Sequence, residues 1–138
     1  MKQIKLKVVT PEKVILSDEV SQVSLNTKMG QITVLPNHIP LVSQLISGEI
    51  IIKKIDGVED WMAVSGGFVE VMPEQVIILA DTAEYAFDID EARAEEAKNK
   101  AEELLKQKVA DSEDYAMVTA KIQKEMARLR VVRRRKKK

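Results

Sequence analysis

Apolar and polar residues alternate along the first part of the chain, with the period of two expected of strands that bury one face. Ile4, Leu6 and Val8 alternate with lysines, and further short apolar runs follow, most of them separated by Pro or Gly. These runs are residues 14–16, 23–25, 32–34, 50–52, 61–64, 68–71 and 75–80. No helical pattern separates them, so this region predicts an antiparallel sandwich or barrel and disfavours a parallel sheet.

One turn carries a specific signal. Asp56-Gly57 stands between two apolar runs, at residues 50–52 and 61–64. Asp-Gly is favoured in type I′ turns because both central residues need a positive φ. The pair therefore predicts a β-hairpin with a type I′ turn.

The pattern changes to a helical one after residue 87. Asp88 and Glu91 have the spacing of a capping box, which predicts the start of a first helix. Small and apolar residues then recur every three or four positions, forming a narrow stripe on one face. The stripe comprises Ala94, Ala97, Ala101, Leu104 and Leu105.

A second helix is predicted to follow a short break at residues 109–111, with Asp111 and Ser112 as its cap. Its predicted apolar face comprises Tyr115, Val118, Ile122, Met126 and Leu129. A short break favours antiparallel neighbours, so we expect a helical hairpin. An alanine-rich seam buries little apolar area, and we therefore expect this hairpin to be weakly held and able to open.

Composition excludes several classes of site. The 138 residues include no Cys and a single His, which excludes a disulfide framework, a thiolate zinc site and a multi-histidine metal site. No apolar run approaches the roughly 18–20 residues of a membrane span. We expect a soluble intracellular protein without a metal site.

The formal net charge of zero conceals two unlike regions. Residues 1–87 carry 7 basic and 11 acidic residues, whereas residues 88–138 carry 15 basic and 11 acidic ones. Residues 128–138 hold eight basic residues and no acid. Such a tail is most often solvated and disordered; an acidic protein surface is the next interpretation, and nucleic acid the last, because no aromatic residue is interleaved.

The candidate chemistry is sparse. His38 lies between two prolines and Ser65 lacks a nucleophile motif, so we expect no catalysis. Asp90, Arg93 and Lys100 share a side of the first helix, and Lys124 and Arg128 are four residues apart on the second. These side chains form either a solvated charged surface, which the pattern alone favours, or a set of cations that converge on an anion when the hairpin closes.

Five short segments carry a family resemblance. They are residues 9–11 (Val-Thr-Pro), 30–41 (Gly-Gln-Ile-Thr-Val-Leu-Pro-Asn-His-Ile-Pro-Leu), 64–71 (Val-Ser-Gly-Gly-Phe-Val-Glu-Val), 81–84 (Asp-Thr-Ala-Glu) and 89–94 (Ile-Asp-Glu-Ala-Arg-Ala). In this order and spacing, the chain resembles the epsilon subunits of bacterial and chloroplast F-type ATP synthases over nearly its whole length. The last segment is similar to the Ile/Leu-Asp-x-x-Arg-Ala pattern of the bacterial members that bind ATP.

The resemblance implies a fold and a place in a complex. It implies a ten-stranded antiparallel β-sandwich at residues 1–87 and a two-helix hairpin at residues 88–138. It further implies a non-catalytic rotor subunit at the cytoplasmic face of the membrane, which binds the gamma subunit and the c-ring and couples proton-driven rotation to ATP synthesis. By analogy, the residues facing the c-ring and gamma are Lys28, Met29, Gly30, Gln31 and His38.

The resemblance also implies a regulatory switch. In a compact form the helices fold against the sandwich; in an extended form they rise along gamma, meet the alpha and beta subunits and block ATP hydrolysis. No cofactor is required, but ATP is expected as a regulatory ligand of the compact form. Its expected site comprises Glu84, Ile89, Asp90, Arg93, Ala94, Lys100, Lys124 and Arg128, with Ile89 and Asp90 at the adenine and the four cations at the phosphates. Lys100 and Lys124 replace arginines of relatives, which removes a bidentate fork but keeps the charge.

A different class of function fits the pattern too. A stand-alone β-sandwich with a basic helical tail would hold nucleic acid or an acidic partner. It would show strongly salt-dependent binding and no association with ATP synthase subunits.

Overall fold

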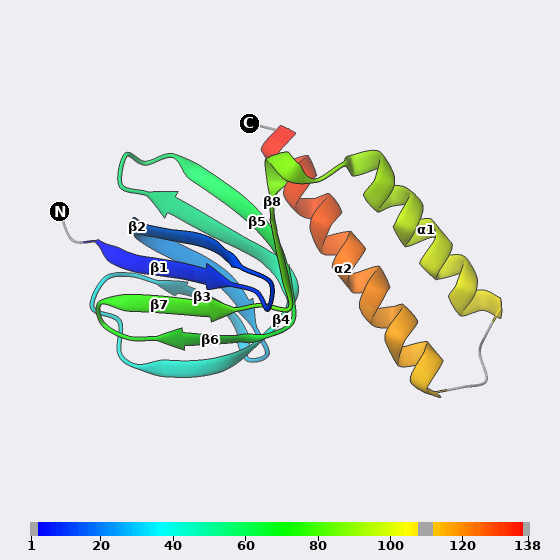
Figure 1. Cartoon of the computed structure of the whole chain (residues 1–138), viewed down its shortest axis with the longest axis horizontal. Coiled ribbons are helices and arrows are strands. Elements are labelled where there is room, and N and C mark those ends of the chain that lie inside the picture. The colour runs from blue at the N-terminus through cyan, green and yellow to red at the C-terminus, as the bar shows by residue number, and fades with distance from the viewer. Residues whose placement is uncertain (1–2, 108–111, 137–138) are drawn as a thin grey trace.

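The computed structural model describes residues 3–107 and 112–136, as a β domain followed by two helices (Figure 1). Their order along the chain is eight strands, one short 3₁₀ helix and two α-helices. The strands are β1 (Ile4–Val9), β2 (Val14–Thr27), β3 (Gly30–Val34), β4 (Leu41–Lys54), β5 (Glu59–Ser65), β6 (Phe68–Val71), β7 (Gln75–Leu79) and β8 (Thr82–Tyr85). The helices are η1 (Ala86–Asp88), α1 (Glu91–Gln107) and α2 (Ser112–Lys136).

Two long strands, β2 and β4, join both layers of the sandwich. The first part of β2 pairs with β1, and the first part of β4 pairs with β6, with β7 between β1 and β6. The later parts of β2 and β4 pair with each other, flanked by β3 on one side and by β5 and β8 on the other. The expected ten strands are therefore eight continuous ones, because β2 and β4 each supply a segment to both layers. Register shifts near Ser21 and Asn26 accompany this passage, as β-bulges do where strands bend.

One pairing contradicts the antiparallel prediction. β1 and β7 are parallel, with Leu6 opposite Val76 and Val8 opposite Ile78, whereas the other pairings are antiparallel. The prediction assumed that parallel neighbours need a helical crossover. Here strands β2 to β6 form the connection between the two, which satisfies the same geometric need for a long crossover.

The hairpin predicted at Asp56-Gly57 is present between β4 and β5, but its turn is not type I′. Gly57 has a φ of 90°, and Asp56 does not share a positive φ. Lys54 and Val58 are joined by a backbone hydrogen bond, and Gly57 N–H donates to the carbonyl of Lys54. This is a three-residue loop with glycine in the left-handed position, the other common hairpin solution.

The sandwich interior is formed by alternate side chains of the strands, as their period predicts. Ile4, Leu6 and Val8 of β1 are fully buried, together with Ile50 and Ile52 of β4. Both faces of β5 are covered. Its Met62 and Val64 enter the interior, while Trp61 and Ala63 belong to a second apolar cluster on the outer face.

Helix α1 begins two residues later than the capping box predicted. Asp88 ends the 3₁₀ helix η1, and Asp90 is the N-cap, its Oδ1 accepting a hydrogen bond from the Arg93 N–H at 3.1 Å. Both positions offer an aspartate, so the local pattern alone did not distinguish them. Packing selects Asp90, because Ala86 and Ile89 are buried beside the outer face of β5 and the helix begins only after them.

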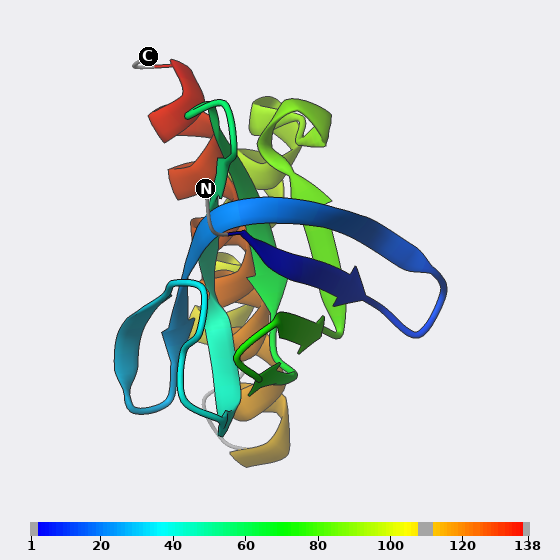
Figure 2. The same ribbon diagram turned by 90° about the vertical axis from the view of Figure 1, so that its left-hand side faces the viewer.

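Helix α2 lies between the sandwich and α1, with its C-terminal half against β4 and β5 (Figures 1 and 2). Its buried residues there include Ala127, Leu129, Val131 and Val132. The predicted apolar face was partly wrong, since Tyr115 and Met126 are 51% and 42% exposed. The helix also continues through the basic residues to Lys136, so the prediction of a disordered tail fails for that part.

The predicted break at residues 109–111 lies outside the described residues. Neither α1 nor α2, over the ranges given above, is long and apolar enough to cross a membrane.

Gly67 is expected to be intolerant of any side chain. Its φ is 104°, and an added Cβ would collide with the Leu79 carbonyl and the Ala80 Cα across the β6–β7 pair. Gly67→Ala should therefore lower the free energy of unfolding by more than about 3 kcal/mol. Gly57→Ala is the matched control, since Gly57 also has a positive φ but faces open space; its cost should be about 1–2 kcal/mol. Urea unfolding of both variants checks this, and equal losses would contradict it.

Candidate functional site

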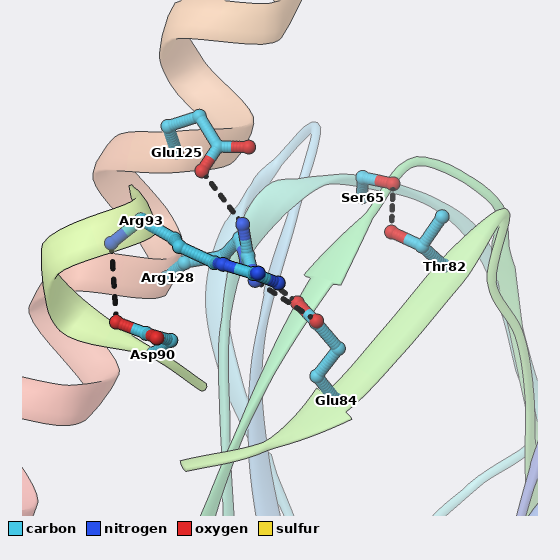
Figure 3. Close-up of polar contacts among 7 residues, drawn as sticks. All are labelled: Ser65, Thr82, Glu84, Asp90, Arg93, Glu125 and Arg128. Carbon is cyan, nitrogen blue, oxygen red and sulfur yellow. Dashed lines mark hydrogen bonds and ion pairs between the residues drawn. The ribbon is translucent and has the colours of Figure 1, made fainter. Parts of the chain in front are cut away.

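Arg128 of α2 is held between two carboxylates at the junction of the helices and the sandwich (Figure 3). Its Nε and Nη2 lie 2.7 and 3.1 Å from the two carboxylate oxygens of Glu84 on β8. Its Nη1 donates to Oε2 of Glu125, one turn earlier on α2, at 2.8 Å. Burial lowers the pKa of Arg128, but the hydrogen bonds and charges of Glu125 and Glu84 outweigh it, so the net pKa is raised. Arg128 is therefore a fully charged link between α2 and the sandwich.

Two further arginines of α2 are paired within the chain. Arg133 contacts Glu91 and Glu95 of α1, with nitrogen–oxygen distances of 3.3 and 3.0 Å. Arg134 contacts Glu49 of β4 at 3.0 Å. For these two residues, the interpretation that the basic tail binds acidic protein groups is the one that fits. The acidic groups belong to the same chain.

A hollow of about 400 Å³ opens between α1 and α2. Arg93, Glu96 and Lys100 of α1 and Lys121 of α2 contribute its charged groups. Its apolar lining consists of Ala97, Ala101, Leu104 and Val118. Lys100 is paired with Glu96 at 3.2 Å but remains largely exposed. Three cations around an open hollow can bind an anion, and an apolar floor suits an aromatic ring.

The expected ATP-site residues are only partly brought together. Arg93 and Lys100 line the hollow, whereas Glu84 and Arg128 bind each other beside the sandwich. Asp90 caps α1 through the Arg93 N–H. Ile89 and Ala94 are buried in the second apolar cluster, and Lys124 is half-buried.

Lys121 is a cation of the hollow that the sequence reasoning missed. It lies three residues after Val118, which had been assigned to the apolar face of the second helix. Residues three apart share a helix face, so this spacing was the available signal.

The residues expected at a docking surface lie on loops at the edge of the sandwich. Lys28 and Met29 form the turn between β2 and β3, and Gly30 and Gln31 begin β3; all four are exposed. Thr27 Oγ1 fixes the turn by accepting from the Met29 N–H and donating to the Gly30 carbonyl. The Lys28 N–H donates to the Gln44 carbonyl, which holds the turn against β4.

His38 lies in the loop between β3 and β4, half-buried, with Nδ1–H donating to the Ile39 carbonyl at 2.7 Å. The Asn37 N–H donates to the Pro73 carbonyl and so ties this loop to the β6–β7 turn. Large apolar side chains are exposed on these loops and the adjoining strand ends: Met29, Leu35, Ile39, Val42 and Met72. Exposed apolar side chains in such number are typical of a protein contact surface.

Ser65 and Thr82, also drawn in Figure 3, hydrogen-bond through their hydroxyls across the β5–β8 pair. Such a contact stabilises strand pairing. Within residues 3–107 and 112–136, no group of three or more His, Asp or Glu side chains is placed to hold a metal ion.

Comparison with known proteins gives the same family over both parts of the chain. The model described as "ATP synthase, Delta/Epsilon chain, beta-sandwich domain" matches residues 3–86, and the "long alpha-helix domain" of the same chain matches residues 88–133. An ATP synthase epsilon chain of Chloroflexus aggregans is 51% identical over 93% of this chain and 91% of its own length. One from Herpetosiphon aurantiacus is 43% identical over 96% of both chains.

A solved structure supports the fold. A chain of the Euglena gracilis mitochondrial ATP synthase, in a structure of OSCP, F1 and the c-ring, superposes with a TM-score of 0.80. It is 24% identical, over 92% of this chain and 79% of that one. The chain therefore belongs to the delta/epsilon family of the ATP synthase, as an epsilon chain, which is a non-catalytic subunit.

Proposed function

We propose that this chain is a rotor subunit in the central stalk of a proton-translocating F-type ATP synthase. Its sandwich binds the gamma subunit and the c-ring and helps to couple rotation to ATP synthesis. The Euglena chain that superposes on this one comes from an assembly of OSCP, F1 and a c-ring, which supports this placement. The chain is then attached to the cytoplasmic face of the cell membrane through the complex. Nucleic acid has no part in this role.

The docking surface is the set of exposed loops around Met29 and His38. Met29 is 90% exposed and Ile39 75%, so neither is needed for the sandwich interior. Apolar side chains held out by well-bonded turns bind a partner at little cost in ordering. This is the surface that we assign to the c-ring and gamma.

The two helices regulate hydrolysis by leaving the sandwich and meeting the catalytic alpha and beta subunits. The observation that carries this proposal is that the helices pack on an apolar cluster of their own. Trp61, Ala63 and Leu129 belong to this second cluster, which is distinct from the sandwich interior formed by Met62, Val64 and their neighbours. Undocking α2 therefore exposes the second cluster while the sandwich interior stays closed. The docked and undocked states differ in the burial of this one cluster, so they can be close in free energy. A ligand then shifts the balance between them by its differential affinity for the two states.

ATP is the regulatory ligand that we assign to the compact form, in the hollow between α1 and α2. Arg93 and Lys100, two of the cations expected at the phosphates, line this hollow, and Lys121 stands opposite them on α2. Arg128 is already neutralised by Glu84 and Glu125. We therefore assign the phosphates to Arg93, Lys100 and Lys121, with Arg128 fixing the position of α2. A ligand held by both helices favours the state in which they are packed together.

Met29→Asp should weaken binding of the chain to a c-ring–gamma assembly by about tenfold or more, because it places a charge in an apolar contact. Folding should be unaffected, since the side chain is exposed. Met117→Asp is the matched control, as Met117 is 72% exposed on α2. Surface plasmon resonance measures both affinities. Unchanged binding by Met29→Asp would remove this surface from the proposal.

Deleting residues 88–138 should leave a folded sandwich that still binds gamma, and should raise ATP hydrolysis by the reconstituted complex. The sandwich interior contains no residue of this segment, which is why it is expected to survive. Hydrolysis is compared between complexes with the full and the shortened chain. Equal rates in the two complexes would argue against an inhibitory role for the helices.

ATP binding is tested by isothermal titration calorimetry with the full chain. Arg93→Ala should weaken ATP binding by about tenfold or more, because it removes a charged partner of the phosphates. Lys124→Ala should bind like the wild type, since Lys124 is not among the described residues that line the hollow. If the wild type gave no heat at millimolar ATP, the site would not exist; if Lys124→Ala were the weaker binder, the phosphates would lie nearer Arg128.

A further inference from the structure

Two carboxylates flank a small residue in a row across the outer face of the sandwich. In the strand register, Glu49 of β4 is opposite Ala63 of β5, and Ala63 is opposite Glu84 of β8. Directly opposed residues point to the same face of a sheet. Ala63 belongs to the cluster covered by α2, so both carboxylates lie on the face that α2 covers.

Helix α2 places an arginine at each end of this row. Arg128 binds Glu84, and Arg134 binds Glu49. Six residues turn an α-helix by about 600°, so the two arginines project about 120° apart around α2. One therefore reaches β8 and the other reaches β4, the two outer strands of the row.

The carboxylates at the two ends of the row differ in how deeply they are buried. Glu84 is one-third exposed, whereas Glu49 is 9% exposed. Oε1 of Glu49 forms an ion pair with Nη2 of Arg134 at 3.0 Å, and its Oε2 is buried without a hydrogen-bond partner among the described residues. Arg134 itself is 52% exposed and stays hydrated. Within the pair, the buried partner is thus the acid and the exposed partner is the base.

We infer that Glu49 makes docking of α2 on the sandwich conditional on Arg134. Docking removes the Glu49 carboxylate from water, and Arg134 is the cation that compensates it. Loss of one partner of a buried pair is costly because the other charge is left uncompensated, whereas loss of both is often neutral. Removing Arg134 therefore opposes docking, while removing the Glu49 charge relieves the same cost.

This pair has a role in the switch only if the proposed function holds, but its effect on docking does not depend on that function. In the switch, α2 leaves the sandwich only as Glu49 regains water and Arg134 regains a free guanidinium. The basic end of α2 is then available to an acidic partner at the moment of release. The pairing of Arg134 with Glu49 and its pairing with an acidic partner are mutually exclusive.

The test measures opening of α2 on the isolated full chain. Because the natural chain has no cysteine, Val131→Cys provides a single thiol in the buried cluster, and its labelling rate by a thiol reagent reports how often α2 leaves the sandwich. On this background, Arg134→Gln should raise the labelling rate about tenfold. Glu49→Gln combined with Arg134→Gln should return it to within about twofold of the background. Arg130→Gln, which removes an equal charge from an exposed position of α2, should leave the rate unchanged.

Two results would overturn the inference. One is an Arg134→Gln rate no higher than that of Arg130→Gln, which would mean that the pair does not hold the helix. The other is a double variant that labels as fast as Arg134→Gln alone, which would mean that Glu49 imposes no condition. Gln and Arg have similar helix propensities, so an altered helix does not explain a difference. Neither result would bear on whether the chain binds a rotor or inhibits hydrolysis.

Discussion

The structure depends on the burial of strand β5 on both of its faces. The inner face closes the sandwich with Met62 and Val64, and the outer face, with Trp61 and Ala63, is covered by α2. An uncovered outer face would leave a tryptophan and its apolar neighbours in water. In the docked form the helix therefore covers this face, yet it contributes no side chain to the interior of the sandwich. That division lets one part of the molecule move while the other remains a rigid body.

Charge, more than apolar area, determines where α2 sits. The apolar cluster under it contains alanines at positions 63, 86 and 94, which bury little surface each. Three arginines fix the orientation of α2, because each binds a carboxylate on a different element. Arg128 binds one on β8, Arg133 one on α1 and Arg134 one on β4. Charged contacts of this kind fix register more than they add stability, and they are exchangeable for contacts with another acidic surface. A helix held in this way is positioned without being locked.

Much of this architecture was predictable, because the strands follow a period of two and the helices follow strong helix formers. The wrong predictions concern positions whose local structure depends on contacts with residues that are distant in sequence. The local pattern of β2 and β4 suggested several short strands, since a bend between layers looks like a break in sequence. Asp88 and Asp90 are equally good caps, and packing of Ile89 selects the second. The end of α2 looked like a solvated tail because Glu49 and Glu91, its partners, are remote in sequence.

The charged groups predicted for a nucleotide site illustrate the same limit more sharply. The family resemblance implied that four cations (Arg93, Lys100, Lys124 and Arg128) and two carboxylates (Glu84 and Asp90) belong to a single ATP site. The fold divides them: Arg93 and Lys100 remain at the hollow, and Arg128 is taken by Glu84. An arginine with two carboxylate partners carries little net attraction for a phosphate, since binding the phosphate would first require breaking both pairs. Arginine therefore has two roles in this chain, and the carboxylates within reach determine which one. An arginine paired with two carboxylates anchors a helix, whereas an arginine beside an open hollow can bind a ligand.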